Sequence, residues 1–256
     1  MPKIVFQGHM PVPHERLMQN VAHAHSLGLP MLENAREHYR RLAVVGGGPS
    51  ARRHLKEIAR FDNVISINGA CGWLRENGIE STVLTLDPLP IMAERVKGAK
   101  KAILCSRCDP SVFEVLKDAE ITLFDAFTDM PGGVWASVSS VTSLFDISTR
   151  LGHRRTVFFG CEGSFEPDST SHAYMNEAEH HEFLFEVECG GQKYLTAPDL
   201  YIQCQQMIPF LRLAVNESFT EESGGLLRAM VRNDEHDIVR VSKSLLAGLS
   251  PLKEAA

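Results

Sequence analysis

Six short runs rich in β-branched and aromatic residues alternate with amphipathic stretches along the middle of this chain. The runs lie at 42–45, 64–67, 82–86, 101–104, 121–124 and 156–159. Strands that alternate with helices are typical of βαβ units, in which right-handed crossovers join parallel strands. We therefore predict an α/β fold with a Rossmann-like, doubly wound, mostly parallel sheet.

The segments that flank this alternating region have a different pattern. Residues 12–41 show helical spacing, interrupted at Gly28-Leu29-Pro30. After Gly160 a β-hairpin is expected over Glu182–Ala197, turning at Gly190-Gly191, with helices over 198–214 and 234–249. We divide the chain into an N-terminal helical preface (1–41), a Rossmann-like nucleotide-binding domain (42–220) and a C-terminal helical extension (221–256).

Composition narrows the classes of partner and compartment. A chain of 256 residues is long enough to bury a substantial core. Its formal net charge of −6, with acidic and basic residues interspersed, disfavours a nucleic-acid partner. No segment approaches the roughly 20 apolar residues of a membrane span, so we expect no membrane insertion and a cytoplasmic protein. Six irregularly spaced cysteines fit reduced thiols. A homo-oligomer is compatible with the sequence, which does not specify the oligomeric state.

The end of the first predicted strand carries the most informative loop. Gly46, Gly47 and Gly48 lead through Pro49 and Ser50 into a predicted helix. Such a loop lets backbone N–H groups converge on an anion, and the alternative is a tight turn without a ligand. A dehydrogenase of the Rossmann type would need an acidic residue near the end of the second strand, where this chain has Asn68.

Other candidate residues follow later strands. Asp87 could hold Mg²⁺ on donor phosphates or accept from a ribose hydroxyl, or it could simply cap a helix. His172, in a polar loop after the sixth strand, could act as an acid, a base or a phosphate contact, or could be an ordinary loop histidine. The lone pair Cys105 and Cys108 favours a structural role over zinc binding. His180 and His181 favour a solvated helix face over a metal site.

Three of these segments together resemble the MptE-like family, which comprises the archaeal-type 6-hydroxymethyl-7,8-dihydropterin pyrophosphokinases and the core domain of Maf motility accessory factors. The segments are VVGGGPS at Val44–Ser50, VISINGA at Val64–Ala70 and VLTLDP at Val83–Pro88. The resemblance continues through Gly132–Ser137, the strand ending at Gly160, the Ser171-His172 loop and the hairpin, and so covers residues 42–220.

The resemblance implies a sheet related to that of bacterial sialyltransferases and a nucleotide-dependent transferase. In its pyrophosphokinase members, diphosphate passes from ATP to a hydroxymethylpterin with the help of Mg²⁺. For the glycosylation-linked members, the resemblance implies a reaction that uses an activated nonulosonic sugar. On this basis we assign catalysis to Asp87 and His172, and Mg²⁺ to Asp87 and Glu162. Nucleotide binding falls to Gly46, Gly47, Gly48, Pro49, Ser50, Asn68, Gly69 and Ser137.

One departure from the family pattern leaves the substrate open. The family's Gly-x-Asp after the sixth strand is Gly160-Cys161-Glu162 in this chain, which lengthens the acidic arm by a methylene. Our first hypothesis is therefore an enzyme that transfers diphosphate from ATP, or another nucleotide, to a small pterin-like acceptor. The alternatives are a glycosyltransferase-like protein that uses a CMP-type sugar, and a nucleotide-binding accessory protein without turnover.

Overall fold

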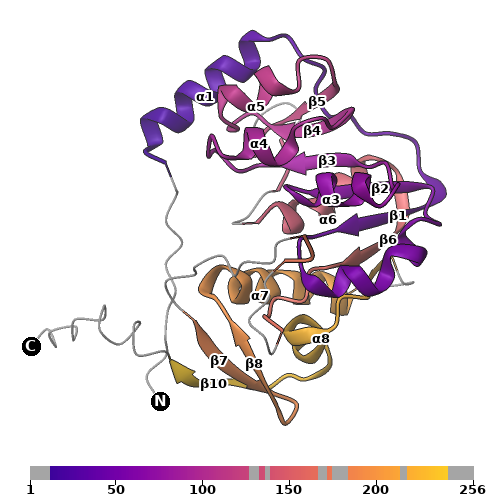
Figure 1. Cartoon of the computed structure of the whole chain (residues 1–256), viewed down its shortest axis with the longest axis vertical. Helices are drawn as coiled ribbons and strands as arrows, with labels where there is room; N and C mark the ends of the chain where they lie inside the picture. Colours follow the sequence, from indigo (N-terminus) through magenta and orange to yellow (C-terminus); the bar gives the residue numbers. More distant parts are fainter. Residues whose placement is uncertain are drawn as a thin grey trace, which may run out of the picture.

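A seven-stranded parallel sheet forms the centre of the protein (Figure 1). The computed structural model describes residues 12–126, 133–135, 139–166, 172–174, 184–213 and 218–241. The strands are β1 (His38–Val45), β2 (Asn63–Ile67), β3 (Thr82–Thr85), β4 (Lys101–Cys105), β5 (Glu120–Phe124), β6 (His153–Phe159) and β9 (Phe219–Glu221). Their order is β5-β4-β3-β2-β1-β6-β9, and every neighbouring pair is parallel. This confirms the predicted α/β, Rossmann-like fold.

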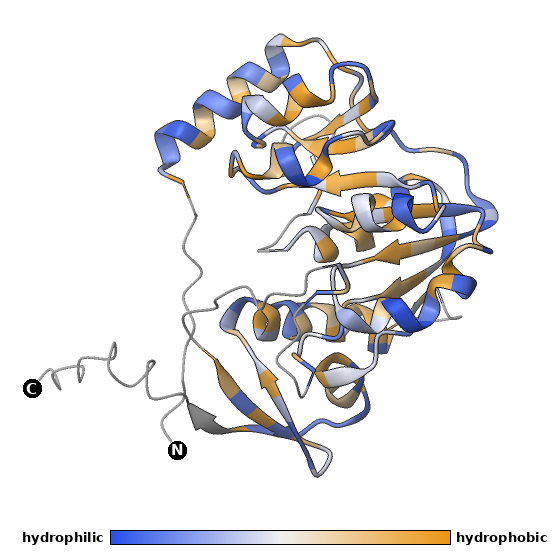
Figure 2. Ribbon diagram, viewed as in Figure 1, coloured by the Kyte–Doolittle hydropathy of each residue, from blue (hydrophilic) through white to orange (hydrophobic). Residues whose placement is uncertain are grey.

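Helices cover both faces of this sheet. They are α1 (His14–Ser26), the 3-10 helix η1 (Pro49–His54), α2 (Leu55–Ile58), α3 (Ala70–Glu76), α4 (Met92–Val96), α5 (Pro110–Val115), α6 (Ser140–Arg150), α7 (Pro198–Leu213) and α8 (Gly225–Arg232). Along β1, Leu42 and Val44 belong to one apolar cluster, whereas Ala43 and Val45 belong to another. The second half of the strand is therefore buried on both faces, as parallel strands usually are, and Figure 2 shows the sheet as mostly hydrophobic.

The winding direction of the sheet reverses at β1. Strands β2 to β5 extend to one side of it, whereas β6 and β9 lie on the other. At the carboxyl end of β1, Val45 is paired with Ser66 of β2 and with Phe159 of β6. In open α/β sheets, ligands bind in the crevice outside the carboxyl ends of the strands at such a switch point.

A small antiparallel sheet lies beside α7 and α8 (Figure 1). It contains β7 (Phe185–Cys189), β8 (Gln192–Thr196) and β10 (His236–Val241), in the order β10-β7-β8. Gly190 and Gly191 connect β7 to β8 with φ angles of 59° and 75°, which glycine adopts without strain. The predicted hairpin is thus confirmed. Among the described residues, no helix is long and apolar enough to cross a bilayer.

One predicted helix is wrong, and another is shorter than predicted. Residues 236–241 form β10, because pairing with β7 in the folded chain overrides the helical spacing of this segment. At the other end, α1 stops at Ser26, Met31 makes a bridge to Leu123, and β1 already begins at His38. The short strand β9 was not expected from the sequence, and it adds an edge beside β6.

Candidate functional site

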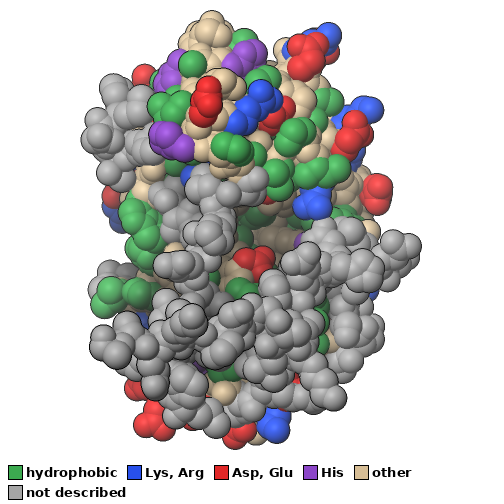
Figure 3. Space-filling view, turned by 90° about the vertical axis from the view of Figure 1, so that its left-hand side faces the viewer, with side chains coloured by type: hydrophobic (Ala, Val, Ile, Leu, Met, Phe, Trp, Pro, Cys, Tyr) green, Lys and Arg blue, Asp and Glu red, His purple; other side chains and the backbone are tan. Residues whose placement is uncertain are grey.

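A cavity of about 230 Å³ lies beyond the carboxyl ends of β1 and β6. Figure 3 views the side toward which the main-sheet strands point and shows a hollow at mid-height. The predicted site residues that line the cavity are Gly46, Gly47, Gly48, Asn68, Glu162 and His172. Sequence positions more than 120 residues apart therefore meet at the switch point. Ser137 lies outside the described residues.

Most N–H groups of the glycine loop bond within the chain. The Gly46 N–H donates to the carbonyl oxygen of Phe159 and the Gly48 N–H to that of Gly160, both at 2.8 Å. The Ser50 N–H donates to a carboxylate oxygen of Glu162 at 2.7 Å. The Gly47 N–H has no acceptor among the described residues. Phosphate binding by this loop therefore stays a prediction that depends on the Gly47 N–H.

The carboxylate of Glu162 fills the space at the start of η1. The residue is 5% exposed, and its second oxygen accepts from the Ser50 hydroxyl at 2.8 Å. A Cβ on Gly48 would overlap this carboxylate, so glycine is required there. Burial raises the pKa of Glu162, although the hydrogen bonds from Ser50 oppose that shift. Glu162 thus provides an internal hydrogen-bond acceptor for the loop.

A short segment with two aromatic rings lies over the glycine loop. The rings of His172 and Tyr174 have centroids 5.2 Å apart, and both residues line the cavity. The Ala173 N–H donates to the Gly47 carbonyl oxygen at 2.7 Å, which fixes this segment above the loop. A Cβ on Gly69 would meet the Tyr174 hydroxyl at 3.1 Å, so Gly69 lies beneath the same ring. Tyr174 was not predicted from the sequence, although an aromatic residue two positions after the candidate residue His172 could have indicated a further member of the site.

Asn68 has an unusual backbone and an unsatisfied side chain. Its φ is 49°, the single positive value among the described non-glycine residues. Its N–H donates to the Leu84 carbonyl oxygen at 3.0 Å, while its side-chain oxygen Oδ1 is buried without a hydrogen-bond partner. Strained backbones and unpaired buried polar atoms are rare and concentrate at functional sites.

The carboxylates assigned to Mg²⁺ do not come together in one site. Asp87 is not among the cavity-lining residues, and its Oδ1 accepts from the Leu89 N–H at 3.0 Å, which is a turn-capping arrangement. Both oxygens of Glu162 already accept from Ser50. The described part of the chain contains no group of three or more His, Cys, Asp or Glu side chains suited to a metal ion. The residues present therefore do not fit a magnesium centre built from Asp87 and Glu162.

Arg95 and Asp199 complete the polar lining of the cavity. Arg95, from α4, is the one guanidinium among the described lining residues, and Asp199 lies in the first turn of α7. A cation and a carboxylate thus face the cavity together with a histidine. This combination can compensate a phosphate charge and accept a proton.

Cys105 and Cys108 are structural in this fold. Both are fully buried, and the Cys108 thiol donates to the Thr85 carbonyl oxygen at 3.5 Å. Burial raises the pKa of both thiols, which keeps them protonated and unreactive. His180 and His181 lie outside the described residues.

No family model matches the sequence. No curated protein matches it either. A solved structure of a mammalian sialyltransferase is similar to this chain, with a TM-score of 0.41 and 11% sequence identity. The match covers 84% of this chain and 81% of that one.

Proposed function

We propose that this protein is a nucleotide-dependent transferase whose donor nucleotide binds in the switch-point cavity. The observation that carries the proposal is Asn68, which combines a positive φ with an unpaired, buried Oδ1 at the cavity wall. Reorientation of this amide toward a base or ribose would satisfy its oxygen. Arg95 is positioned to compensate phosphate charge, and His172 to exchange a proton.

The donor that suits these residues is a nucleotide-activated sugar of the CMP type. Transfer of diphosphate from ATP would depend on Mg²⁺ and on free N–H groups around the phosphates. The glycine loop offers one such N–H group, at Gly47, and the described residues do not assemble a magnesium centre. Transfer of a glycosyl group needs a positioned acceptor, a proton acceptor and compensation of the leaving phosphate. The cavity provides His172 as the proton acceptor and Arg95 to compensate the charge of the leaving phosphate.

In the proposed reaction, His172 takes the proton from the acceptor hydroxyl. The hydroxyl oxygen then forms a bond to the anomeric carbon of the sugar, and the bond from that carbon to the phosphate oxygen breaks. The electron pair of the broken bond stays on the nucleotide phosphate, where the Arg95 guanidinium compensates the charge. The ring of Tyr174 covers the site from the same side as His172.

A panel of donors tests this proposal. We expect CMP to raise the unfolding temperature more than ATP, because the ligand that binds more tightly stabilises the folded state more. A ligand at 100 times its Kd stabilises the folded state by about 2.7 kcal/mol. We also expect CMP release from CMP-activated sugars in the presence of an acceptor. AMP release from ATP, Mg²⁺ and hydroxymethyl-dihydropterin would instead support the pyrophosphokinase alternative. Tight nucleotide binding without release of either product would support an accessory protein.

A further inference from the structure

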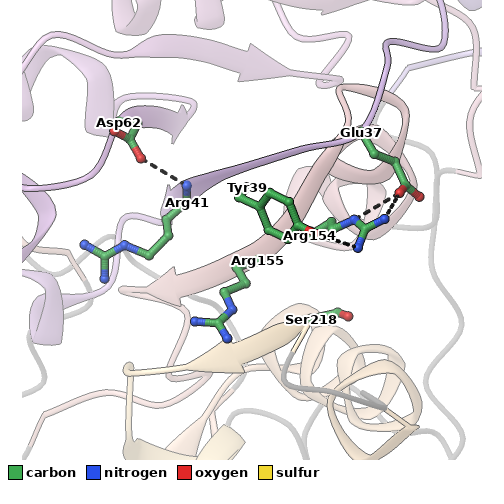
Figure 4. Close-up of a pocket in the computed structure, with 7 residues that line it drawn as sticks. All are labelled: Glu37, Tyr39, Arg41, Asp62, Arg154, Arg155 and Ser218. Atoms are coloured by element: carbon green, nitrogen blue, oxygen red, sulfur yellow. Dashed lines mark hydrogen bonds and ion pairs between the residues drawn. The ribbon is translucent and has the colours of Figure 1, made fainter.

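A second hollow lies at the opposite edge of the main sheet, where β1 and β6 begin. Its volume is about 740 Å³, and three arginines line it: Arg41 of β1 and Arg154 and Arg155 of β6. Figure 4 shows the guanidinium groups of Arg41 and Arg155 pointing to the same side of the two strands. This groove is separate from the switch-point cavity, with which it shares no lining residue.

One of the two carboxylates in the groove is paired with an arginine, and the other accepts a hydrogen bond from the backbone. Glu37 forms an ion pair with Arg154, which donates from Nε at 2.9 Å. Asp62 accepts from the backbone N–H of Arg41 at 3.2 Å. Neither the Arg41 nor the Arg155 guanidinium has a carboxylate within 4.0 Å among the described residues. The groove therefore holds two guanidinium groups whose charge the described chain does not pair.

These two arginines are direct neighbours in the sheet. Arg41 is paired in register with Arg155, and like charges at paired positions repel. Arg41 is held in place because its guanidinium lies 4.5 Å from the centroid of the Phe61 ring. An anion bound between the two groups would convert this repulsion into attraction. Guanidinium forks match the oxygens of a phosphate group, which favours a phosphate as the anion in this groove.

We propose that this groove is a second ligand site, which binds a phosphate-bearing small molecule through Arg41 and Arg155. The phosphate group could belong to free pyrophosphate or to a nucleotide. The Arg154 guanidinium lies over one face of the Tyr39 ring, 5.1 Å from its centroid. The ring is 82% exposed at the groove and offers its other face for stacking if the ligand carries a base. The site does not depend on the proposed transfer reaction, because it lies at the other edge of the sheet.

Isothermal titration with inorganic pyrophosphate at low salt tests the site. We expect Arg155→Gln and Arg41→Gln each to weaken binding at least tenfold, and the double variant to abolish it. Lys56→Gln, which removes the same charge from an exposed position on α2, should leave the affinity within twofold of wild type. Gly47→Ala, in the switch-point cavity, should also leave pyrophosphate binding intact. Circular dichroism verifies that each variant is folded.

The source of the phosphate is distinguished by a second titration. If the natural ligand is a nucleotide, Tyr39→Leu should weaken AMP or CMP binding at the groove and leave pyrophosphate binding unchanged. If the ligand is a free phosphate compound, Tyr39→Leu should change neither. Absence of pyrophosphate binding to the wild-type protein would overturn the proposal. Equal affinity in the wild type and a folded Arg41→Gln/Arg155→Gln double variant would overturn it as well.

Discussion

The carboxylate of Glu162 accepts two hydrogen bonds from Ser50, one from the backbone N–H at 2.7 Å and one from the hydroxyl at 2.8 Å. This contact joins the loop after β6 to the start of η1, so two segments that border the switch point are hydrogen-bonded to each other. The backbone of Glu162 also accepts from the Leu227 N–H at 2.9 Å, which ties α8 to the same place. A residue expected to hold a metal ion thus has a clear structural role.

Removal of this carboxylate should destabilise the fold more than its neutralisation. Glu162→Ala leaves the buried Ser50 N–H without an acceptor, for which we expect a loss of about 1–3 kcal/mol in the free energy of unfolding. Glu162→Gln keeps an oxygen for that N–H, and the Ser50 hydroxyl can accept from the new amide, so the loss should stay below about 1 kcal/mol. Urea unfolding of both variants measures the difference. Equal losses would show that the hydrogen bonds do not support the fold.

The same residue should make stability depend on pH. Burial raises the folded-state pKa of Glu162 above the ordinary value of 4.5. In the interval between these two values the folded protein binds more protons than the unfolded one, so stability falls as the pH rises. The difference in unfolding free energy between the wild type and Glu162→Gln should therefore shift in favour of the variant across this interval. A difference that is constant with pH would contradict the raised pKa.

Substitution of Gly47 should weaken nucleotide binding. A Cβ at this position would lie 2.7 Å from His172 Cδ2 and 3.0 Å from the Tyr174 hydroxyl, so Gly47→Ala must displace both rings. We expect at least a tenfold loss of nucleotide affinity in a folded protein. Gly72→Ala is the matched control, because its Cβ meets nothing within 4 Å and alanine favours the helix α3. The idea fails if the two variants bind nucleotide equally well.

His172→Ala should reduce turnover more than donor affinity. If His172 accepts the proton of the acceptor hydroxyl, its loss should lower kcat by about 10²–10⁴-fold while the Kd for the nucleotide changes little. Single-turnover kinetics and binding by calorimetry separate the two effects. His14→Ala, at the exposed first residue of α1, is the control. Wild-type kcat in His172→Ala would remove this residue from the reaction.

Asp87→Asn distinguishes the two transfer reactions. Asp87 does not line the cavity, and an asparagine oxygen can still accept from the Leu89 N–H. We therefore expect glycosyl transfer to remain within about threefold of wild type, since a half-buried turn cap outside the cavity lining contributes little to the site. Loss of most activity, together with a dependence on Mg²⁺, would restore the assignment of Asp87 to a metal-assisted reaction.

The sequence predicts those features that depend on local pattern and misses those that depend on distant pairing. The six expected strands of the main sheet are present, because continuous β-branched runs are typical of strands that are buried on both faces. β9 has only three residues, and the segment of β10 has helical spacing, so both strands depend on pairing with β6 and β7.

The candidate site likewise has residues that the sequence predicted and contacts that it did not. Gly46–Ser50, Asn68, Glu162 and His172 could be found because each follows a predicted strand, and the parallel topology gathers such positions at one edge. What the sequence could not reveal is that Glu162 turns inward to Ser50 and that Tyr174 lies over Gly69. Both facts depend on side-chain packing between segments that are far apart in the chain.

The central position of β1 also affects how the chain reaches its native state. Its edge toward β6 has no partner until residues near Phe159 have been synthesised, whereas β2 follows it closely in the sequence. Translation proceeds at about 5–20 residues per second, so this apolar strand waits several seconds on the ribosome for its second neighbour. Such late closure of long-range parallel pairs slows folding and leaves an aggregation-prone edge exposed in the nascent chain.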